Sequence, residues 1–326
     1  MESLRDAGCP IAVIHYRNSR GGLADAMGRC DAHVLLPCPE TLGSDFPRGW
    51  VGYIPDLQHK RMPHWFQEEE SRHRDKKFTT LLDEASAVVV NSASVVSDIQ
   101  EFYSGYKARI FALPYCPPVR QVEFPESLRL EVRSRYTLPE RYFLISNQFW
   151  VHKSHETAFR ALRRVREAGY DVGLVCTGNT SDYRWPEHLS HLMEVIEENR
   201  MREHIRILGQ VPKRDQLAIM SESLAVIQPS LFEGGPGGGA VYDAVSLNKP
   251  CIVSDIAVNR EIDIGEVRFF AAGSQEDLAA KMIEMLVHPP EMQEQEQVSA
   301  LLRSRQAEFA AVLRKAARVA VGRAPR

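Results

Sequence analysis

Short apolar runs alternate with amphipathic polar segments along most of this chain. A polar segment from about residue 67 to 84 predicts a long surface helix, and Ser92 or Ser94 can cap the helix that follows. Buried strands are expected at the apolar runs 10–16, 33–37, 50–54, 87–92 and 109–114. Strands and helices that alternate at this spacing predict a parallel sheet with helices on both faces.

From residue 141 onward the alternation is more regular. Ser154 can cap a helix that Gly169 ends, and Ser274 with Asp277 forms a capping-box-like start for another helix. Strands are expected at residues 142–147, 171–178, 205–211, 224–230, 251–255 and 267–273. The predicted fold class is therefore α/β with two sheets, and ligands should bind in the cleft at the carboxyl ends of the strands.

A proline- and charge-rich stretch separates the two blocks, and 326 residues are enough for two domains. We expect a first domain at residues 1–120, a linker at 121–140, a second domain at 141–300 and a C-terminal helix at 301–326. This last segment is basic and weakly amphipathic. It is expected either to pack back across the domains or to make a peripheral contact with an anionic membrane.

Composition narrows the class of protein. The formal net charge is −3, whereas nucleic-acid-binding proteins usually carry a basic excess, so no nucleic-acid partner is expected. No apolar run is long enough to span a bilayer, and the acidic residues near the start do not suit a signal peptide. The six cysteines show neither a Cys-x-x-Cys pair nor metal-ligand spacing, which favours reduced thiols in a cytoplasmic protein.

A glycine-rich stretch, SLFEGGPGGGAVYDAV, follows one predicted strand and leads into a helix. Three interpretations are open: a flexible connector, a dinucleotide fingerprint, or a cradle for a phosphate. The fingerprint would be Gly235-x-Gly237-x-x-Ala240, with Asp255 as the ribose-binding acid. The cradle is favoured because glycines allow close approach of an anion, and a helix N-terminus offers unpaired N–H groups.

Several charged residues lie close to expected strand ends. Glu233 and Asp243 flank the glycine loop, and Lys153 precedes a helix. Carboxylates there can accept hydrogen bonds from sugar hydroxyls, and an ammonium group can meet a diphosphate. His152 and His155 flank Lys153, but without a third ligand they indicate surface or supporting roles rather than a metal site.

Asp56 and His59 end an apolar strand of the first block, where active-site groups often collect. No Asp-x-Asp pair occurs, so a metal ion held in that way is not expected.

These motifs together resemble glycosyltransferase family 4 over roughly residues 50–285. The matching segments, in the order of the family, are YIPDLQHKRMPHWFQEEESRHRDKKF, VVVNSASVVSDI, SNQFWVHKSHETAFRAL, ILGQVPKRDQLAIM and QPSLFEGGPGGGAVYDAVSLNKPCIVSDIAVNREI. The resemblance implies a GT-B architecture, in which two Rossmann-like domains face each other across a cleft. It also implies that the second domain holds most of the nucleotide-sugar donor.

The resemblance assigns roles residue by residue. Lys153 matches the basic residue at the donor diphosphate, and Glu233 matches the first acid of a Glu-x7-Glu motif, at the donor sugar. Asp243 falls where the second acid holds the ribose, and Asp56 and His59 would lie near the acceptor. The remaining donor-binding residues that it implies are Asn147, Gln148, Gly209, Gly234, Gly235, Gly237, Gly238, Gly239 and Ala240.

Three departures from the family pattern stand out. The acids read Glu-x9-Asp, so the loop is two residues longer and the second acid is shorter. Asn147 and Gln148 replace an arginine, which leaves more of the charge neutralisation to Lys153. The first domain also lacks an obvious opening strand with a glycine-rich turn, so we expect it to be shortened.

The expected function is transfer of a hexose-type sugar from a UDP- or GDP-linked donor, with retention of configuration and without cofactor or metal. A glycan or lipid-linked glycan would be the acceptor, in cell-surface polysaccharide biosynthesis. Two alternatives stay open at this point. One is a non-catalytic or incomplete GT-B nucleotide-binding protein, and the other is an NAD-dependent oxidoreductase.

Overall fold

The strands expected between residues 33 and 114 form a parallel sheet in sequence order. They are β1 (Val34–Cys38), β2 (Gly49–Ile54), β3 (Ala87–Val90) and β4 (Arg109–Ala112). The structure is a computed structural model that describes residues 18–120 and 124–322. The strand expected at 10–16 lies outside these described residues.

Each face of this first sheet is covered by different helices. Side chains of α2 (Arg20–Arg29), α4 (Glu68–Glu84) and α5 (Ala93–Phe102) pack on one face, with Trp50 and Ile54 of β2. The opposite face packs on the far half of α12 (Gln295–Gly322), where Val51 meets the small residues Ala316 and Ala320. Alternate residues of one strand thus supply two separate cores.

The second sheet is larger and also parallel. Its order is β10-β9-β8-β5-β6-β7, so the chain builds outward from β5 in both directions. Its strands are β5 (Tyr142–Ser146), β6 (Gly173–Thr177), β7 (Ile205–Gly209), β8 (Val226–Gln228), β9 (Cys251–Ser254) and β10 (Val267–Phe270). This is the doubly wound order, in which ligands bind where the direction reverses, here between β5 and β8.

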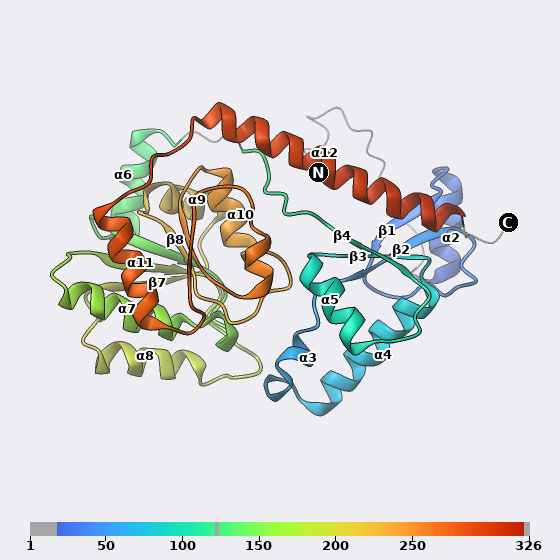
Figure 1. The fold of residues 1–326 in the computed structure, drawn as a ribbon, viewed down its shortest axis with the longest axis horizontal. Coiled ribbons are helices and arrows are strands. Elements are labelled where there is room, and N and C mark those ends of the chain that lie inside the picture. The colour runs from blue at the N-terminus through green and yellow to red at the C-terminus, as the bar shows by residue number, and fades with distance from the viewer. Residues whose placement is uncertain (1–17, 121–123, 323–326) are drawn as a thin grey trace.

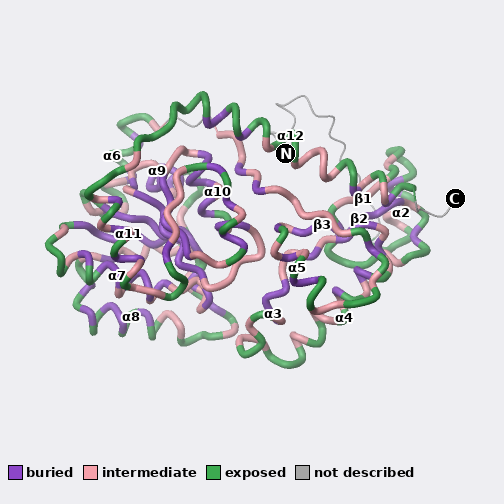
Figure 2. The backbone as a smooth tube through the Cα atoms, in the orientation of Figure 1, coloured by how far each residue is buried: buried purple, intermediate pink, exposed green. Residues whose placement is uncertain are grey.

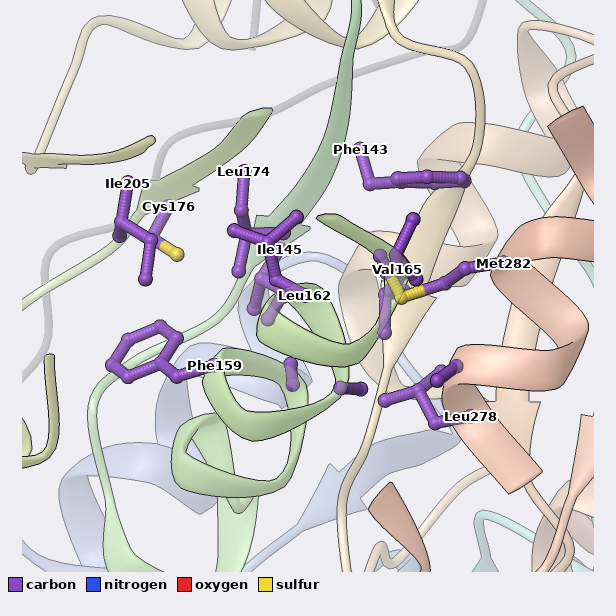
Figure 3. Close-up of a cluster of buried hydrophobic side chains, with 14 of the residues drawn as sticks. Phe143, Ile145, Phe159, Leu162, Val165, Leu174, Cys176, Ile205, Leu278 and Met282 are labelled. Atoms are coloured by element: carbon purple, nitrogen blue, oxygen red, sulfur yellow. The ribbon is translucent and has the colours of Figure 1, made fainter. Parts of the chain in front are cut away.

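Helices cover both faces of the second sheet. α7 (His155–Glu167), α8 (His188–Glu198) and α11 (Gln275–Val287) lie on one face, where Leu278 and Met282 of α11 pack beside α7 (Figure 3). α6 (Glu126–Arg135), α9 (Lys213–Glu222), α10 (Gly238–Ser246) and the start of α12 lie on the other. The purple, buried positions of Figure 2 concentrate along these strands.

Two segments connect the two lobes, which are the parts of the chain built around the first and the second sheet. The stretch 121–140, expected as a linker, contains α6, whose Leu128 and Val132 are buried in the core of the second lobe. The long helix α12 starts on the second lobe and crosses to the first (Figure 1). No helix within the described ranges is long and apolar enough to cross a bilayer.

Three of the four helix ends predicted from capping residues are confirmed. The Ser92 hydroxyl accepts a hydrogen bond from Val95 N at 3.2 Å, and Ser274 accepts one from Asp277 N at 3.1 Å. Gly169 has a φ of +90° after α7. The expectation for Ser154 was wrong in its detail: it precedes α7 with a φ of +51°, and its hydroxyl pairs with Thr157 Oγ1 at 2.8 Å instead of capping the backbone.

Candidate functional site

A pocket of about 340 Å³ opens at the carboxyl ends of β5, β6 and β7. Its lining is uncharged and mostly polar: Ser146, Asn147, Gln148, Thr177, Gly178, Asn179, Gln210, Val211 and Gln216. The strand ends approach closely here, because a Cβ at Gly178 would lie only 1.9 Å from the Asn147 carbonyl oxygen. Gly178 N also donates to Gly209 O at 2.8 Å, so Gly209 shapes the wall of the pocket through its backbone.

Beside this pocket, the predicted basic and acidic residues form a direct pair. Lys153 Nζ donates to Glu233 Oε1 at 2.6 Å, and the side chains are only 12% and 8% exposed. Gln228 Nε2 donates to the same oxygen at 2.6 Å, and Gln228 Oε1 accepts from Asn147 Nδ2. A continuous set of hydrogen bonds therefore joins the pocket wall to Glu233.

The glycine loop between β8 and α10 is tightly constrained. Gly237 and Gly238 have φ angles of +66° and +59°, and a Cβ at Gly237 would lie 2.5 Å from Val241 Cβ. Gly237 N donates to the buried Asn259 Oδ1 at 2.8 Å, and Gly238 N donates to Gly235 O at 3.3 Å.

This pattern corrects one expectation. The resemblance implied that the N–H groups of residues 234–239 face the ligand as a set, but those of Gly237 and Gly238 hold the loop itself in shape. No acceptor among the described residues takes the N–H of Gly239 or Ala240, at the first turn of α10. The N–H groups of Gly234 and Gly235 also have no acceptor among the described residues, but those of Gly239 and Ala240 lie at a helix N-terminus, which suits an anion.

The same loop touches the first lobe. A Cβ at Gly234 would lie 2.5 Å from Pro55 O and 2.8 Å from Asp56 Cβ. Ser92 Oγ donates to Gly234 O at 3.1 Å. Asp56 thus lies at the cleft, as expected, and its Oδ1 accepts from Arg74 Nη2 at 2.6 Å. No described residue donates to Asp56 Oδ2, so that oxygen is available to a ligand.

His59 does not lie where the sequence suggested. Its side chain is 0% exposed, and its Nε2 lies 3.0 Å from Asp75 Oδ1 on α4. Burial lowers the pKa of His59 below its ordinary value. A fully buried ring cannot contact an acceptor hydroxyl in this conformation, so the geometry gives His59 a supporting role: it holds Asp75, which also binds Lys60 at 2.6 Å.

Asp243 is nearly buried on α10 and engaged by two cations. Arg120 Nη2 donates to its Oδ1 at 2.9 Å, and Lys213 forms an ion pair with its Oδ2. Lys213 begins α9, between the pocket residues Gln210 and Gln216. Neither cation was predicted from the sequence, because one comes from the segment that follows β4 and the other from the start of α9.

Contacts between the lobes continue on both sides of the glycine loop. The Glu261 carboxylate accepts from Ala93 N and Ser94 N, each at 2.8 Å, at the start of α5. On the other side, the Arg184 guanidinium lies 4.0 Å from the centre of the Phe66 ring. A carboxylate at a helix N-terminus and a cation over an aromatic face are both attractive arrangements, so they hold the lobes closed.

His152 and His155, expected at the surface or in supporting positions, are both buried, at 6% and 0% exposure. Burial is the largest cause that lowers the pKa of His152 to about 2 and that of His155 to about 3. The His155 ring stacks on Phe149 with centroids 4.1 Å apart. Both rings are thus buried against aromatic neighbours as neutral groups. Within the described ranges, no three His, Cys, Asp or Glu side chains gather as a metal site.

We expect these two histidines to make the protein sensitive to acid. Below pH 6.5 these two histidines bind protons in the unfolded chain but not in the folded protein. Their contribution to the free energy of unfolding is therefore fully present above pH 6.5 and decreases as the pH falls toward 3. The free energy of unfolding should decrease by about 1.4 kcal/mol per pH unit for each histidine. In His155→Phe, urea unfolding at pH 7 and pH 5.5 should show a loss about 1 kcal/mol smaller than in wild type. An identical pH dependence in the two proteins would contradict this assignment.

The sheet order separates the three interpretations of the glycine loop. The loop follows β8, whereas a dinucleotide fingerprint follows the first strand of a doubly wound sheet, here β5. Asp255 Oδ1 accepts from Ala272 N at 2.9 Å, so it is turned toward the next strand connection rather than toward a ribose. The packing of the loop against both lobes does not fit a flexible connector.

A family model described as "Glycosyl transferases group 1" matches residues 131–300, which is more than half of the chain. The chain belongs to this family. The match covers the second sheet, the pocket, Lys153 and the glycine loop. A search of curated proteins gave no match.

Solved structures extend the likeness of this group 1 glycosyltransferase to the whole fold. Sucrose-phosphate synthase from Thermosynechococcus elongatus is 16% identical with a TM-score of 0.67, over 91% of this chain and 75% of that chain. HepE from Anabaena, in complex with UDP, is 15% identical with a TM-score of 0.68, over 96% and 88%. A glycosyltransferase from Rickettsia africae is 13% identical with a TM-score of 0.66, over 96% and 87%. The architecture is GT-B, as expected from the sequence.

Proposed function

We propose that this protein is a retaining, metal-independent hexosyltransferase that uses a nucleoside-diphosphate sugar. The observation that carries the proposal is the Lys153–Glu233 pair, which lies between the uncharged pocket and Asp56 of the first lobe. The pocket is suited to a nucleoside, since amide and hydroxyl groups can hydrogen-bond a base and a ribose. Structures of the neighbour HepE with UDP and with UDP-glucose favour UDP as the nucleotide.

In this proposal, Lys153 and the N–H groups of Gly239 and Ala240 stabilise charge on the diphosphate as the glycosidic bond breaks. These donors are fixed before reaction, and preorganised donors stabilise developing charge efficiently. Glu233 would accept hydrogen bonds from the donor sugar through Oε2, because its Oε1 is already occupied by Lys153 and Gln228. Contacts between the lobes would exclude water and so suppress hydrolysis of the donor.

The acceptor hydroxyl is proposed to enter beside Asp56, whose free Oδ2 would orient it. Its proton would pass to the leaving phosphate, as the resemblance to family 4 suggests, so no carboxylate nucleophile is required. We propose a glycan or lipid-linked glycan as the acceptor, in cell-surface polysaccharide biosynthesis. Exposed Arg314, Lys315 and Arg318 on α12 offer a basic face for a peripheral membrane contact on the cytoplasmic side.

The proposal is tested by release of nucleoside diphosphate from a panel of UDP- and GDP-linked hexoses, followed by mass spectrometry with and without glycan acceptors. Consumption of one donor that depends on an acceptor is expected. Binding of UDP or GDP without any turnover would favour the non-catalytic alternative instead. Thermal shifts with UDP, GDP and NAD identify the bound nucleotide, because a ligand held by the folded state raises its apparent stability.

Glu233→Gln should impair handling of the donor sugar more than binding of the nucleotide. The amide keeps the size of the side chain but loses the negative charge. That charge pairs with Lys153 and strengthens the hydrogen bonds that the carboxylate would accept from the sugar hydroxyls. We expect kcat to fall by about 10²-fold, while the Kd for UDP changes by less than about threefold. Calorimetry with UDP and steady-state kinetics give the two values. Equal losses in both would contradict the assignment of Glu233 to the sugar.

A further inference from the structure

Gln228 is a polar residue in an otherwise apolar strand. Its neighbours in β8, Val226 and Ile227, are fully buried in the two cores, and Gln228 itself is 0% exposed. A buried amide is costly unless its hydrogen bonds are made. This amide makes three, with Asn147, Ser230 and Glu233.

The partners determine which way the amide points. Its Oε1 accepts from Asn147 Nδ2, so its Nε2 faces the glycine loop and donates to Glu233 Oε1 at 2.6 Å. Lys153 Nζ approaches the same Oε1, also at 2.6 Å. Two donors on one oxygen fix the rotation of the carboxylate. Its other oxygen, Oε2, then lies toward Gly238, 3.1 Å from the position of a Cβ there.

We propose that Gln228 is a positioning residue for the glycosyl transfer, one that orients the Glu233 carboxylate toward the donor sugar. It acts through Glu233 and makes no contact with substrate itself. Through Asn147, it also links that orientation to the wall of the nucleotide pocket. This inference rests on the proposed function, because it assumes that Glu233 meets the sugar.

Few other side chains could accept a hydrogen bond from Asn147 and also donate one to Glu233. Methionine has a similar volume but would leave Asn147 Nδ2 and Glu233 Oε1 without this partner. Glutamate would place a second carboxylate within 3 Å of Glu233 when ionised, but its protonated form can donate to Oε1 as the amide does. The two substitutions therefore differ in a way that pH reveals.

The test compares Gln228→Met, Gln228→Glu and the control Tyr142→Phe. Tyr142→Phe removes another fully buried hydrogen bond, from Tyr142 Oη to Ile219 O at 2.7 Å, at the amino end of β5 and thus away from the pocket. We expect Gln228→Met to lower kcat by about 30-fold, with the Kd for UDP changed less than threefold. The control should lose thermal stability while keeping its kcat.

Two further readouts separate positioning from simple structural support. Gln228→Glu should regain much of its kcat as the pH falls from 8 to 6, relative to wild type at each pH. In a Glu233→Gln background, Gln228→Met should cost less than threefold more, because residues that act as a unit are not additive. If Gln228→Met does not fold, the pH response of Gln228→Glu decides the question alone.

The results distinguish a failure of the proposed role of Gln228 from a failure of the proposed function. An active wild type with an unchanged kcat in Gln228→Met, or with fully additive losses in the double variant, overturns the role of Gln228 only. A wild type that releases no nucleoside diphosphate from any donor overturns the proposed function and this inference with it.

Discussion

Lys153→Ala is expected to lower turnover by about 10³-fold at saturating donor. Lys153 is the cation that the structure places against the glycine loop, since Asn147 and Gln148 stand where the family pattern has an arginine. A diphosphate that leaves without this ammonium group has mainly the backbone N–H groups of Gly239 and Ala240 to stabilise it. Because the charge develops as the bond breaks, kcat should fall more than the affinity for the intact donor.

Two variants make this result interpretable. Lys153→Arg keeps the charge but changes its shape, so it should recover only part of the activity. Lys281→Ala removes a partly exposed lysine of α11 that pairs with Glu284, and it should leave kcat unchanged. Turnover by Lys153→Ala within threefold of wild type, measured as nucleoside diphosphate released at saturating donor, would exclude the proposed role of Lys153.

The sequence predicted the parts of the site that depend on local order. Strand ends, helix starts and the glycine loop follow one another along the chain, so motifs could assign Lys153 and Glu233 to one donor site, but they did not predict the direct ion pair. The doubly wound order then brings the ends of β5 and β8 together. The outward turn of Asp255 and the internal use of the Gly237 N–H could not be inferred, because both depend on partners distant in the sequence.

His59 and Gln228 were not interpreted correctly from the sequence because their environments depend on residues from other segments. His59 was expected at the cleft because it ends a strand, but α4 carries Asp75 and Phe78 over it and buries the ring. Gln228 was overlooked because one glutamine in an apolar strand gives no periodic signal. A buried glutamine destabilises the core or supports a site depending on its hydrogen-bond partners. Here the partners Asn147 and Glu233 come from two other segments.

Gly234→Ala should lower kcat/KM by about 10²-fold with little loss of global stability. The added methyl group would meet Pro55 O at 2.5 Å and Asp56 Cβ at 2.8 Å, distances that folded proteins do not tolerate. Both neighbours belong to the other lobe, so the clash is relieved by moving the lobes apart rather than by repacking a core. A displacement of about 1 Å between reacting groups is enough to cost about 10²-fold in rate.

Contacts between the two lobes oppose their separation in Gly234→Ala. Glu261 at the start of α5 and Arg184 over Phe66 hold the closed contact, so the variant must balance these attractions against the clash. Small-angle X-ray scattering should show a larger radius of gyration than in wild type, and the Kd for UDP should stay within threefold because the pocket lies in one lobe. Gly21→Ala, where a Cβ meets nothing within 4 Å, is the matched control. If Gly234→Ala keeps wild-type scattering and kcat/KM, the closed contact at the glycine loop does not govern catalysis.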